Sequence, residues 1–326
     1  MSASVVRPPS PANRLGIDYR TPPPRKVGVT IVDAHTHLYG GEQLSAMLEA
    51  ANLYGVGPIL SMTPLAEVEA VRAACGDRVR FIAIPHWKSI ARTDEFRAAW
   101  MRDLERFREL GARLCKFWMA PKMRKEHGLT VDHEFVRPVV HEAVRLGYEF
   151  MIHVADPSVW WSEGKPYADT HTYGEKAAQY PQLEWLLDTV APRHVSGVHM
   201  AGSVEDLDRL DRLMERHANL LLDTSATKWM VREVSRHPRS VHDFVVRWGD
   251  RILFGSDLVA SAGYREFDHY ASRYWAHQRL WETDCDGESP IDDPDVDEPP
   301  TLRGCNLPPD TLEKIYSTNI RRLGWV

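Results

Sequence analysis

The chain has 326 residues, of which 43% are hydrophobic and 26% are charged, and its formal net charge is -6 at pH 7. This composition is typical of a soluble protein with a large core, and the mild negative charge argues against broad nucleic-acid binding, which requires a basic face. No apolar stretch approaches the length of a membrane span, so we predict a protein that binds neither membrane nor nucleic acid.

The first residues are rich in proline and lack the apolar centre of a signal peptide. Residues 1–28 therefore predict an extended N-terminal arm, followed by one domain over residues 29–326. The four cysteines are scattered and form no CxxC motif, which favours reduced thiols and a cytoplasmic location.

From Val29 onward, short apolar or β-branched runs alternate with longer segments whose apolar residues recur at helical spacing. The predicted strands are Thr30–His35, Gly57–Met62, Arg80–Pro85, Ala112–Phe117, Glu149–Val154, Val195–His199, Leu220–Thr224 and Arg251–Gly255. The predicted helices are Gln43–Tyr54, Pro64–Cys75, Thr93–Leu110, His133–Leu146, Tyr173–Val190, Ser203–His217, Val231–Trp248 and Thr311–Leu323.

Eight strand–helix units predict an α/β fold of the (β/α)8 TIM-barrel type. A doubly wound sheet is the alternative, but the chain contains no GxGxxG or Walker-type phosphate loop to support it.

Two segments interrupt the alternation, residues 156–172 and a long loop insertion, residues 261–309, between strand 8 and the last helix. Both follow the carboxyl ends of strands, where barrel enzymes build their active sites. Loops of this length are uncommon unless they are functional or disordered. We expect lid-like or interaction segments, with the acidic run 284–298 forming a solvated loop.

Metal-ligand side chains end several predicted strands. His35 and His37 lie two residues apart in "IVDAHTHL", so they face the same side of a strand, and His153 and Asp257 end strands 5 and 8. Because a barrel directs these strand ends to one mouth, we predict that the four residues hold a divalent metal, with zinc as first choice and manganese, iron or nickel as alternatives. For each residue, the competing interpretation is a turn or a satisfied polar group in the core.

Metal-bound water loses its proton near neutral pH and becomes a nucleophile. His199, at the end of strand 6, could then serve as an acid or base or as a further ligand. Asp33 is expected to support the ligands or form a turn, whereas Asp223 either orients a ligand histidine or begins a loop.

Other residues near the predicted mouth are candidates for binding a small-molecule substrate by their position or charge. The competing interpretation of each is ordinary core packing or surface charge. The candidates are Lys116, Trp118, His86, Trp161 and Arg273.

The chain resembles the amidohydrolase superfamily, in particular its amidohydrolase-related branch of metal-dependent hydrolases and decarboxylases. The resemblance rests on "DAHTHL", "IHVAD", "VHMAG", "LFGSD" and the closing "LEKIYSTNIRRLGW", and it spans nearly the whole chain after the arm. It implies that His35, His37, His153 and Asp257 are metal ligands and that His199 is the strand-6 histidine of the family. It also implies that Asp257 takes the proton from the metal-bound water, as it does in some members. It also implies that Lys116 lies where two-metal members carry a carbamylated lysine.

The leading hypothesis is therefore a hydrolase whose metal-activated water attacks an amide, lactone or ester carbonyl. A metal-dependent decarboxylase of a carboxylate-bearing aromatic or enol substrate is the alternative. A non-catalytic binding module is the third hypothesis, and a homo-oligomer is left open.

Overall fold

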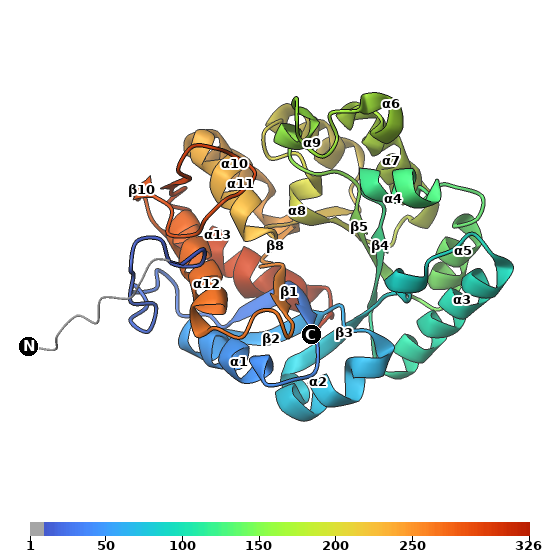
Figure 1. Cartoon of the computed structure of the whole chain (residues 1–326), viewed down its shortest axis with the longest axis horizontal. Coiled ribbons are helices and arrows are strands. Elements are labelled where there is room, and N and C mark those ends of the chain that lie inside the picture. The colour runs from blue at the N-terminus through green and yellow to red at the C-terminus, as the bar shows by residue number, and fades with distance from the viewer. Residues whose placement is uncertain (1–9) are drawn as a thin grey trace, which may run out of the picture.

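The structure is a computed structural model that describes residues 10–326, so the first nine residues of the predicted arm lie outside the described part. Nine parallel strands form one sheet in the order β8-β7-β6-β5-β4-β3-β2-β1-β9, with helices around the outside (Figure 1). The strands are β1 Ile31–Leu38, β2 Val56–Ser61, β3 Val79–Ala83, β4 Leu114–Trp118, β5 Glu149–His153, β6 Val195–Gly197, β7 Leu220–Asp223, β8 Ile252–Leu253 and β9 Leu258–Ala260.

β8 and β9 are consecutive pieces of the eighth barrel strand. β8 pairs with β7, whereas β9 pairs with β1, and the Ala34 amide donates to the Phe254 carbonyl at 2.9 Å between them. The sheet therefore closes on itself, and the predicted (β/α)8 barrel is confirmed.

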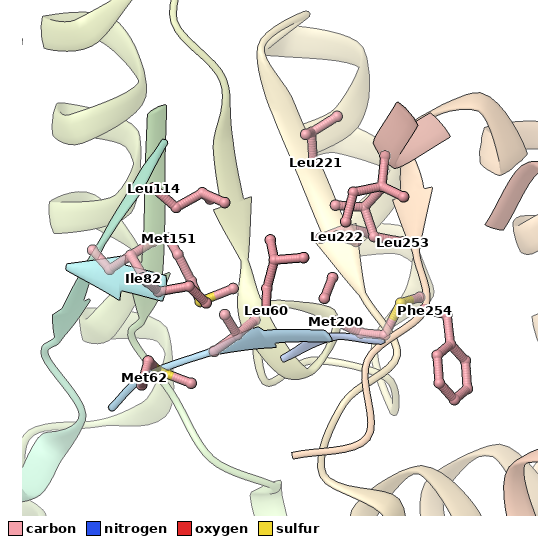
Figure 2. Packing of buried hydrophobic residues seen from close by; sticks show 14 of the residues in the cluster. Leu60, Met62, Ile82, Leu114, Met151, Met200, Leu221, Leu222, Leu253 and Phe254 are labelled. Atoms are coloured by element: carbon pink, nitrogen blue, oxygen red, sulfur yellow. The ribbon is translucent and has the colours of Figure 1, made fainter. Parts of the chain in front are cut away.

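An apolar layer fills the barrel below its polar mouth. Leu114 and Met151 each lie two residues before a predicted site residue, so they face the same side of their strands, deeper in the barrel. Figure 2 shows these two side chains together with Ile82, with Leu60 pointing toward the same interior. This packing supports the site from below and excludes water.

Helices cover the outer face of the barrel (Figure 1). They are α1 Gln43–Leu53, α2 Val68–Cys75, α3 Asp94–Glu109, α4 Pro121–His127, α5 Arg137–Arg145, α6 Thr170–Tyr173, α7 Tyr180–Val190, α9 Leu207–Arg216, α10 Thr227–Arg236, α11 Pro238–Trp248, α12 Phe267–Glu282, α13 Pro309–Glu313 and α14 Asn319–Arg322. The element labelled α8, Val198–Ala201, is a left-handed turn. No helix of the described residues is long and apolar enough to cross a bilayer.

Prolines moved several helix boundaries away from the predicted ones. The single helix predicted over Val231–Trp248 is two helices, because Pro238 begins α11. Pro138 and Pro181 likewise lie at the first turns of α5 and α7, which begin later than predicted. Proline lacks an amide hydrogen and is tolerated only in the first turn of a helix.

The insertion at residues 261–309 is not a plain loop. Its first part forms α12, which packs against α1 and α10, and its second part forms a hairpin of β10 Asp286–Glu288 and β11 Thr301–Arg303. The expectation that 284–298 is a solvated loop was wrong for Asp293, which is buried and paired with the buried Arg232 of α10. Burial of this pair fixes the acidic segment to the barrel.

The described part of the N-terminal arm lies against the insertion. The Asn13 side chain bonds both the amide and the carbonyl of Ile17 at 2.8 Å, and its amide also donates to Asp268 of α12 at 3.0 Å. Residues 10–28 contain no helix or strand.

Candidate metal centre

Two histidines and one carboxylate converge at the carboxyl end of the barrel. Nε2 of His35 and Nε2 of His37, both on β1, each lie 3.2 Å from Oδ1 of Asp257, which follows β8. His35 is buried, whereas the His37 and Asp257 side chains are 31% and 26% exposed, so the cluster is open on one side. Ligands of a tetrahedral cation with bonds of about 2.0 Å lie about 3.3 Å apart, so the two histidine–carboxylate spacings could accommodate a divalent cation.

Asp223 of β7 orients His35. Its Oδ2 lies 2.9 Å from Nδ1 of His35, and the Ser225 hydroxyl lies 2.9 Å from the same nitrogen. With Asp223 ionised, the ring hydrogen is assigned to Nδ1, which leaves the Nε2 lone pair directed at the cluster. Such a contact fixes both the tautomer and the angle of a metal-ligand histidine.

Left-handed backbone presents two of the predicted site residues. His199 has φ 56° in the turn after β6, and Asp257 has φ 59° in the loop between β8 and β9. This conformation costs free energy for residues other than glycine, and residues held in it concentrate at functional sites. The surroundings hold both residues, because the His199 amide donates to Asp223 at 2.8 Å and the Asp257 amide donates to the His35 carbonyl at 2.8 Å.

The loop that carries Asp257 depends on two further residues. Asp33 accepts hydrogen bonds from the Ser256 amide at 3.0 Å and the Ser256 hydroxyl at 2.6 Å. Gly255 lets the loop approach β1, since a β-carbon there would lie 2.9 Å from the β-carbon of His35. Burial raises the pKa of Asp33 to about 6. The structure thus places Asp33 beside the cluster as a support for the loop.

The cluster is electrostatically suited to a cation. Burial alone would raise the pKa of Asp257, but His35 and His37 outweigh burial and hold that pKa well below its usual range. Burial and Lys116 lower the pKa of His35, but Asp223 and Asp257 outweigh them and raise it. Two carboxylates therefore favour a positive charge at the position of His35.

Lys116 of β4 reaches the cluster, with Nζ 3.5 Å from Nε2 of His35. Burial lowers the pKa of Lys116 to about 8, so part of the amine is neutral near neutral pH. The neutral amine is the form that acts as a nucleophile or base.

His153 and His199 form the second side of the site. The His153 ring lies edge-on to the His199 ring at 4.8 Å between centroids, and the His199 ring stacks on His35 at 5.0 Å. Nε2 of His153 is bound to Asp156 at 2.8 Å, and Tyr167 donates to the same carboxylate at 2.6 Å. His153 thus lies beside the cluster of His35, His37 and Asp257 but is not one of its three members.

His199 belongs to another group of ligand-type side chains, together with His35 and Asp223. In that group, both Asp223 oxygens accept hydrogen bonds from His35, His199 and Ser225. Asp223 is therefore better suited to positioning these residues than to binding a metal. Burial lowers the pKa of His199 well below its usual range, so its ring is neutral.

Two cavities flank the centre. One of about 520 Å³ reaches His153 and is walled mainly by aromatic side chains, namely Trp118, Trp160, Tyr167, Tyr173 and Trp229. The other, of about 220 Å³, reaches Asp257 and contains Lys228 and Arg273. A third cavity of about 540 Å³ lies between α11 and the β10–β11 hairpin and is lined by none of the predicted site residues.

The remaining substrate candidates are divided between the site and its surroundings. Trp118 lines the aromatic cavity and Arg273 lines the cavity at Asp257. Trp161 does not line the aromatic cavity, although its neighbour Trp160 does, and its indole N–H donates to the Gly174 carbonyl at 2.9 Å. His86 is exposed and bound to a nearby serine, outside both cavities.

Sequence reasoning missed Ser225, Asp156 and Ser256, which orient the site through hydrogen bonds. Ser225 lies two residues after Asp223 in "DTSA", and Asp156 lies three residues after His153 in "IHVAD". Short polar residues just beyond a strand end were the available signal. Their partners were not evident, because those contacts form in turns rather than in strands.

The comparisons agree with the barrel. No family model matches the chain, and no curated protein matches its sequence. Among solved structures, the 2,6-dihydroxybenzoate decarboxylase from Rhizobium matches with a TM-score of 0.54 at 16% identity, over 91% of this chain and 98% of that chain.

Two further solved structures match at similar levels. The 5-carboxyvanillate decarboxylase from Novosphingobium aromaticivorans, complexed with manganese and 4-hydroxy-3-methoxy-5-nitrobenzoic acid, has a TM-score of 0.50 at 15% identity, over 90% of this chain and 96% of that chain. A Staphylococcus aureus protein provisionally named an amidohydrolase has a TM-score of 0.55 at 12% identity, over 91% of this chain and 100% of that chain. At these identities, the likeness establishes a shared barrel fold.

Proposed function

We propose that the chain is a metal-dependent hydrolase of the amidohydrolase type that acts on a carbonyl group of a small molecule. The observation that carries the proposal is the convergence of His35, His37 and Asp257, with 3.2 Å between each histidine nitrogen and the carboxylate. Zinc is the first candidate metal, and manganese is supported by the structurally similar decarboxylase that holds it.

The residues would divide the work by position. His35, His37 and Asp257 hold the metal, and His153 is the fourth proposed ligand if its ring turns from Asp156. A bound divalent cation would polarise a carbonyl and acidify a water. Asp257 is placed to accept a proton, because it is ionised and partly exposed.

His199 is proposed to supply or take up a proton at the leaving group. Its ring is neutral and its Nδ1 lies 2.7 Å from the Ser225 hydroxyl, so Nε2 is left for substrate. Lys116, 3.5 Å from His35, is proposed to bind a substrate oxygen or to bridge a second ion as a carbamate.

A decarboxylase is the second candidate function. The cavity of about 520 Å³ beside His153 is walled by three tryptophans and two tyrosines, which suits a flat aromatic substrate. Two of the similar barrels are decarboxylases of aromatic acids. In this reaction the same residues would orient a substrate carboxylate.

One screen tests both candidates. Protein loaded with zinc or manganese is incubated with lactones, esters and amides, and separately with hydroxylated aromatic acids. Hydrolysis products and released CO2 are measured. Hydrolysis that His37→Ala abolishes supports the first function, and CO2 release with the same sensitivity supports the second. Absence of both activities, together with absence of metal binding, would leave the binding-module hypothesis.

A further inference from the structure

The smaller cavity combines positive charge with a lining residue, Asp257, that belongs to the proposed metal centre. Its volume is about 220 Å³, and three parts of the chain build it: the start of α10, the β8–β9 loop and the start of the insertion. We call it the Lys228–Arg273 pocket. Its lining residues are Ala226, Thr227, Lys228, Trp229, Ser256, Asp257, Leu258, Val259, Tyr264, His269 and Arg273.

Its two cations have no carboxylate partner. Among the described residues, the Lys228 ammonium makes no hydrogen bond or ion pair, and Arg273 donates only to the His269 carbonyl at 2.9 Å and the Ser272 hydroxyl at 3.0 Å. Burial lowers the pKa of Arg273 to about 10, and burial together with Arg273 lowers that of Lys228. Two half-buried positive groups with no counter-ion are costly unless a ligand compensates them.

The acidic groups around the pocket do not contact its two cations. Asp292, Asp293 and Asp295 act on Lys228 from a distance, but Asp293 and Asp295 are bound to Arg232. Asp257, the one carboxylate that lines the pocket, faces His35 and His37 instead. No acidic side chain of the described residues therefore forms an ion pair with Lys228 or Arg273.

Other features favour an anion at the same place. α10 begins at Thr227, and its preceding residue, Ala226, offers no side chain to cap the helix. The first amides of a helix carry a partial positive charge and attract anions. Trp229 lines both this pocket and the aromatic cavity, so the two cavities are neighbours.

We propose that the Lys228–Arg273 pocket binds an oxyanion group of the substrate, a carboxylate or a phosphoryl group, remote from the bond that reacts. The inference rests on the proposed function, because it takes the reacting group to lie at Asp257. The substrate is then a ring compound that carries an anionic group in addition to the reacting one.

Calorimetric titration of the manganese-loaded protein tests the pocket. The probes are benzoate, with one anionic group, the 1,3- and 1,4-benzenedicarboxylates, with two, and 3-phosphonobenzoate, with a phosphonate as the second. The expected result is that the best two-anion probe binds at least about tenfold more tightly than benzoate, because it gains hydrogen bonds to charged groups. The preferred second group distinguishes a carboxylate from a phosphoryl group.

Lys228→Met should remove this tenfold advantage and leave the affinities for benzoate and manganese unchanged, as should Arg273→Gln where it folds. The matched control is Lys88→Met, which removes an exposed lysine outside the pocket. The proposal is overturned if the two-anion probes bind no more tightly than benzoate, or if Lys228→Met keeps the advantage.

The outcome separates this proposal from the proposed function. Manganese binding without any effect of Lys228→Met rejects the pocket and leaves the metal centre intact. Absence of manganese binding, with two-anion probes still bound through Lys228, rejects the metal centre and supports the pocket.

Discussion

Asp223 Oδ2 lies 2.9 Å from His35 Nδ1, and this contact turns the other ring nitrogen of His35 toward Asp257. The two residues are 188 positions apart in the chain and lie on β7 and β1, so the closed barrel brings them together. The site is therefore a property of the whole barrel rather than of the His-Thr-His motif alone.

Asp223→Asn should weaken metal binding by about 10- to 100-fold, because the orienting carboxylate of a ligand histidine is lost. Calorimetric titration of zinc or manganese measures the loss. Asp243→Asn, which changes an exposed aspartate of α11, should bind metal as the wild type does. An unchanged affinity in a folded Asp223→Asn protein would show that Asp223 does not orient His35.

The backbone strain at the left-handed residue before α10 can be relieved by substitution. Ala226 has φ 65°, which glycine adopts without the steric cost that alanine pays. Ala226→Gly should therefore raise the free energy of unfolding by about 1 kcal/mol. Ala98→Gly, in an exposed position of α3, should lower it by about 1 kcal/mol. Chemical denaturation of both variants checks whether the two signs are opposite.

A buried histidine predicts how stability depends on pH. Nδ1 of His277 accepts from the Trp281 indole at 3.1 Å, and its Nε2 lies 3.0 Å from the Thr227 hydroxyl, which donates to the Ser256 carbonyl. Burial lowers the pKa of His277 to about 3, below the value of about 6.5 expected in the unfolded chain. The unfolded state therefore binds the proton first as pH falls, and the folded state loses stability between pH 6.5 and 3.

The expected loss from His277 is about 2 kcal/mol between pH 7 and pH 5. Denaturant unfolding at the two pH values measures it. His277→Gln, which keeps an acceptor and a donor, should reduce this pH dependence by the same amount. An unchanged dependence in His277→Gln would show that His277 does not titrate as its burial implies.

The aromatic cavity predicts selectivity for ring compounds. Trp118→Leu removes one aromatic wall without touching the cluster of His35, His37 and Asp257, and it should weaken benzoate binding about fivefold, since ring contacts contribute about 1 kcal/mol. Metal affinity should stay unchanged. Titration of benzoate into both proteins tests this, and equal affinities would place the ring elsewhere.

The barrel could be predicted from the sequence, because its strands are short apolar runs between amphipathic helices. The helix α12 could not be predicted, since it is buried around much of its circumference and has no single apolar stripe. The sequence analysis also misplaced the starts of the helices α5, α7 and α11, which begin at or next to Pro138, Pro181 and Pro238.

For the site, too, the residues on strands could be predicted and those in turns could not. Strand period placed His35 and His37 on one side of β1, which the structure shows facing Asp257. The roles of Asp156 and Ser225 could not be predicted, because turns after the strands set their directions and strand period says nothing about turns.

The most direct test of the metal centre is a titration of zinc and manganese into metal-free wild-type protein and into Asp257→Asn. Asparagine tolerates the left-handed backbone at this position, so the variant should keep the loop while losing the charged ligand. We expect the wild type to bind a divalent ion and Asp257→Asn to bind it at least 100-fold more weakly. A wild type that binds neither ion, or an Asp257→Asn protein that binds as tightly, would contradict the proposed centre.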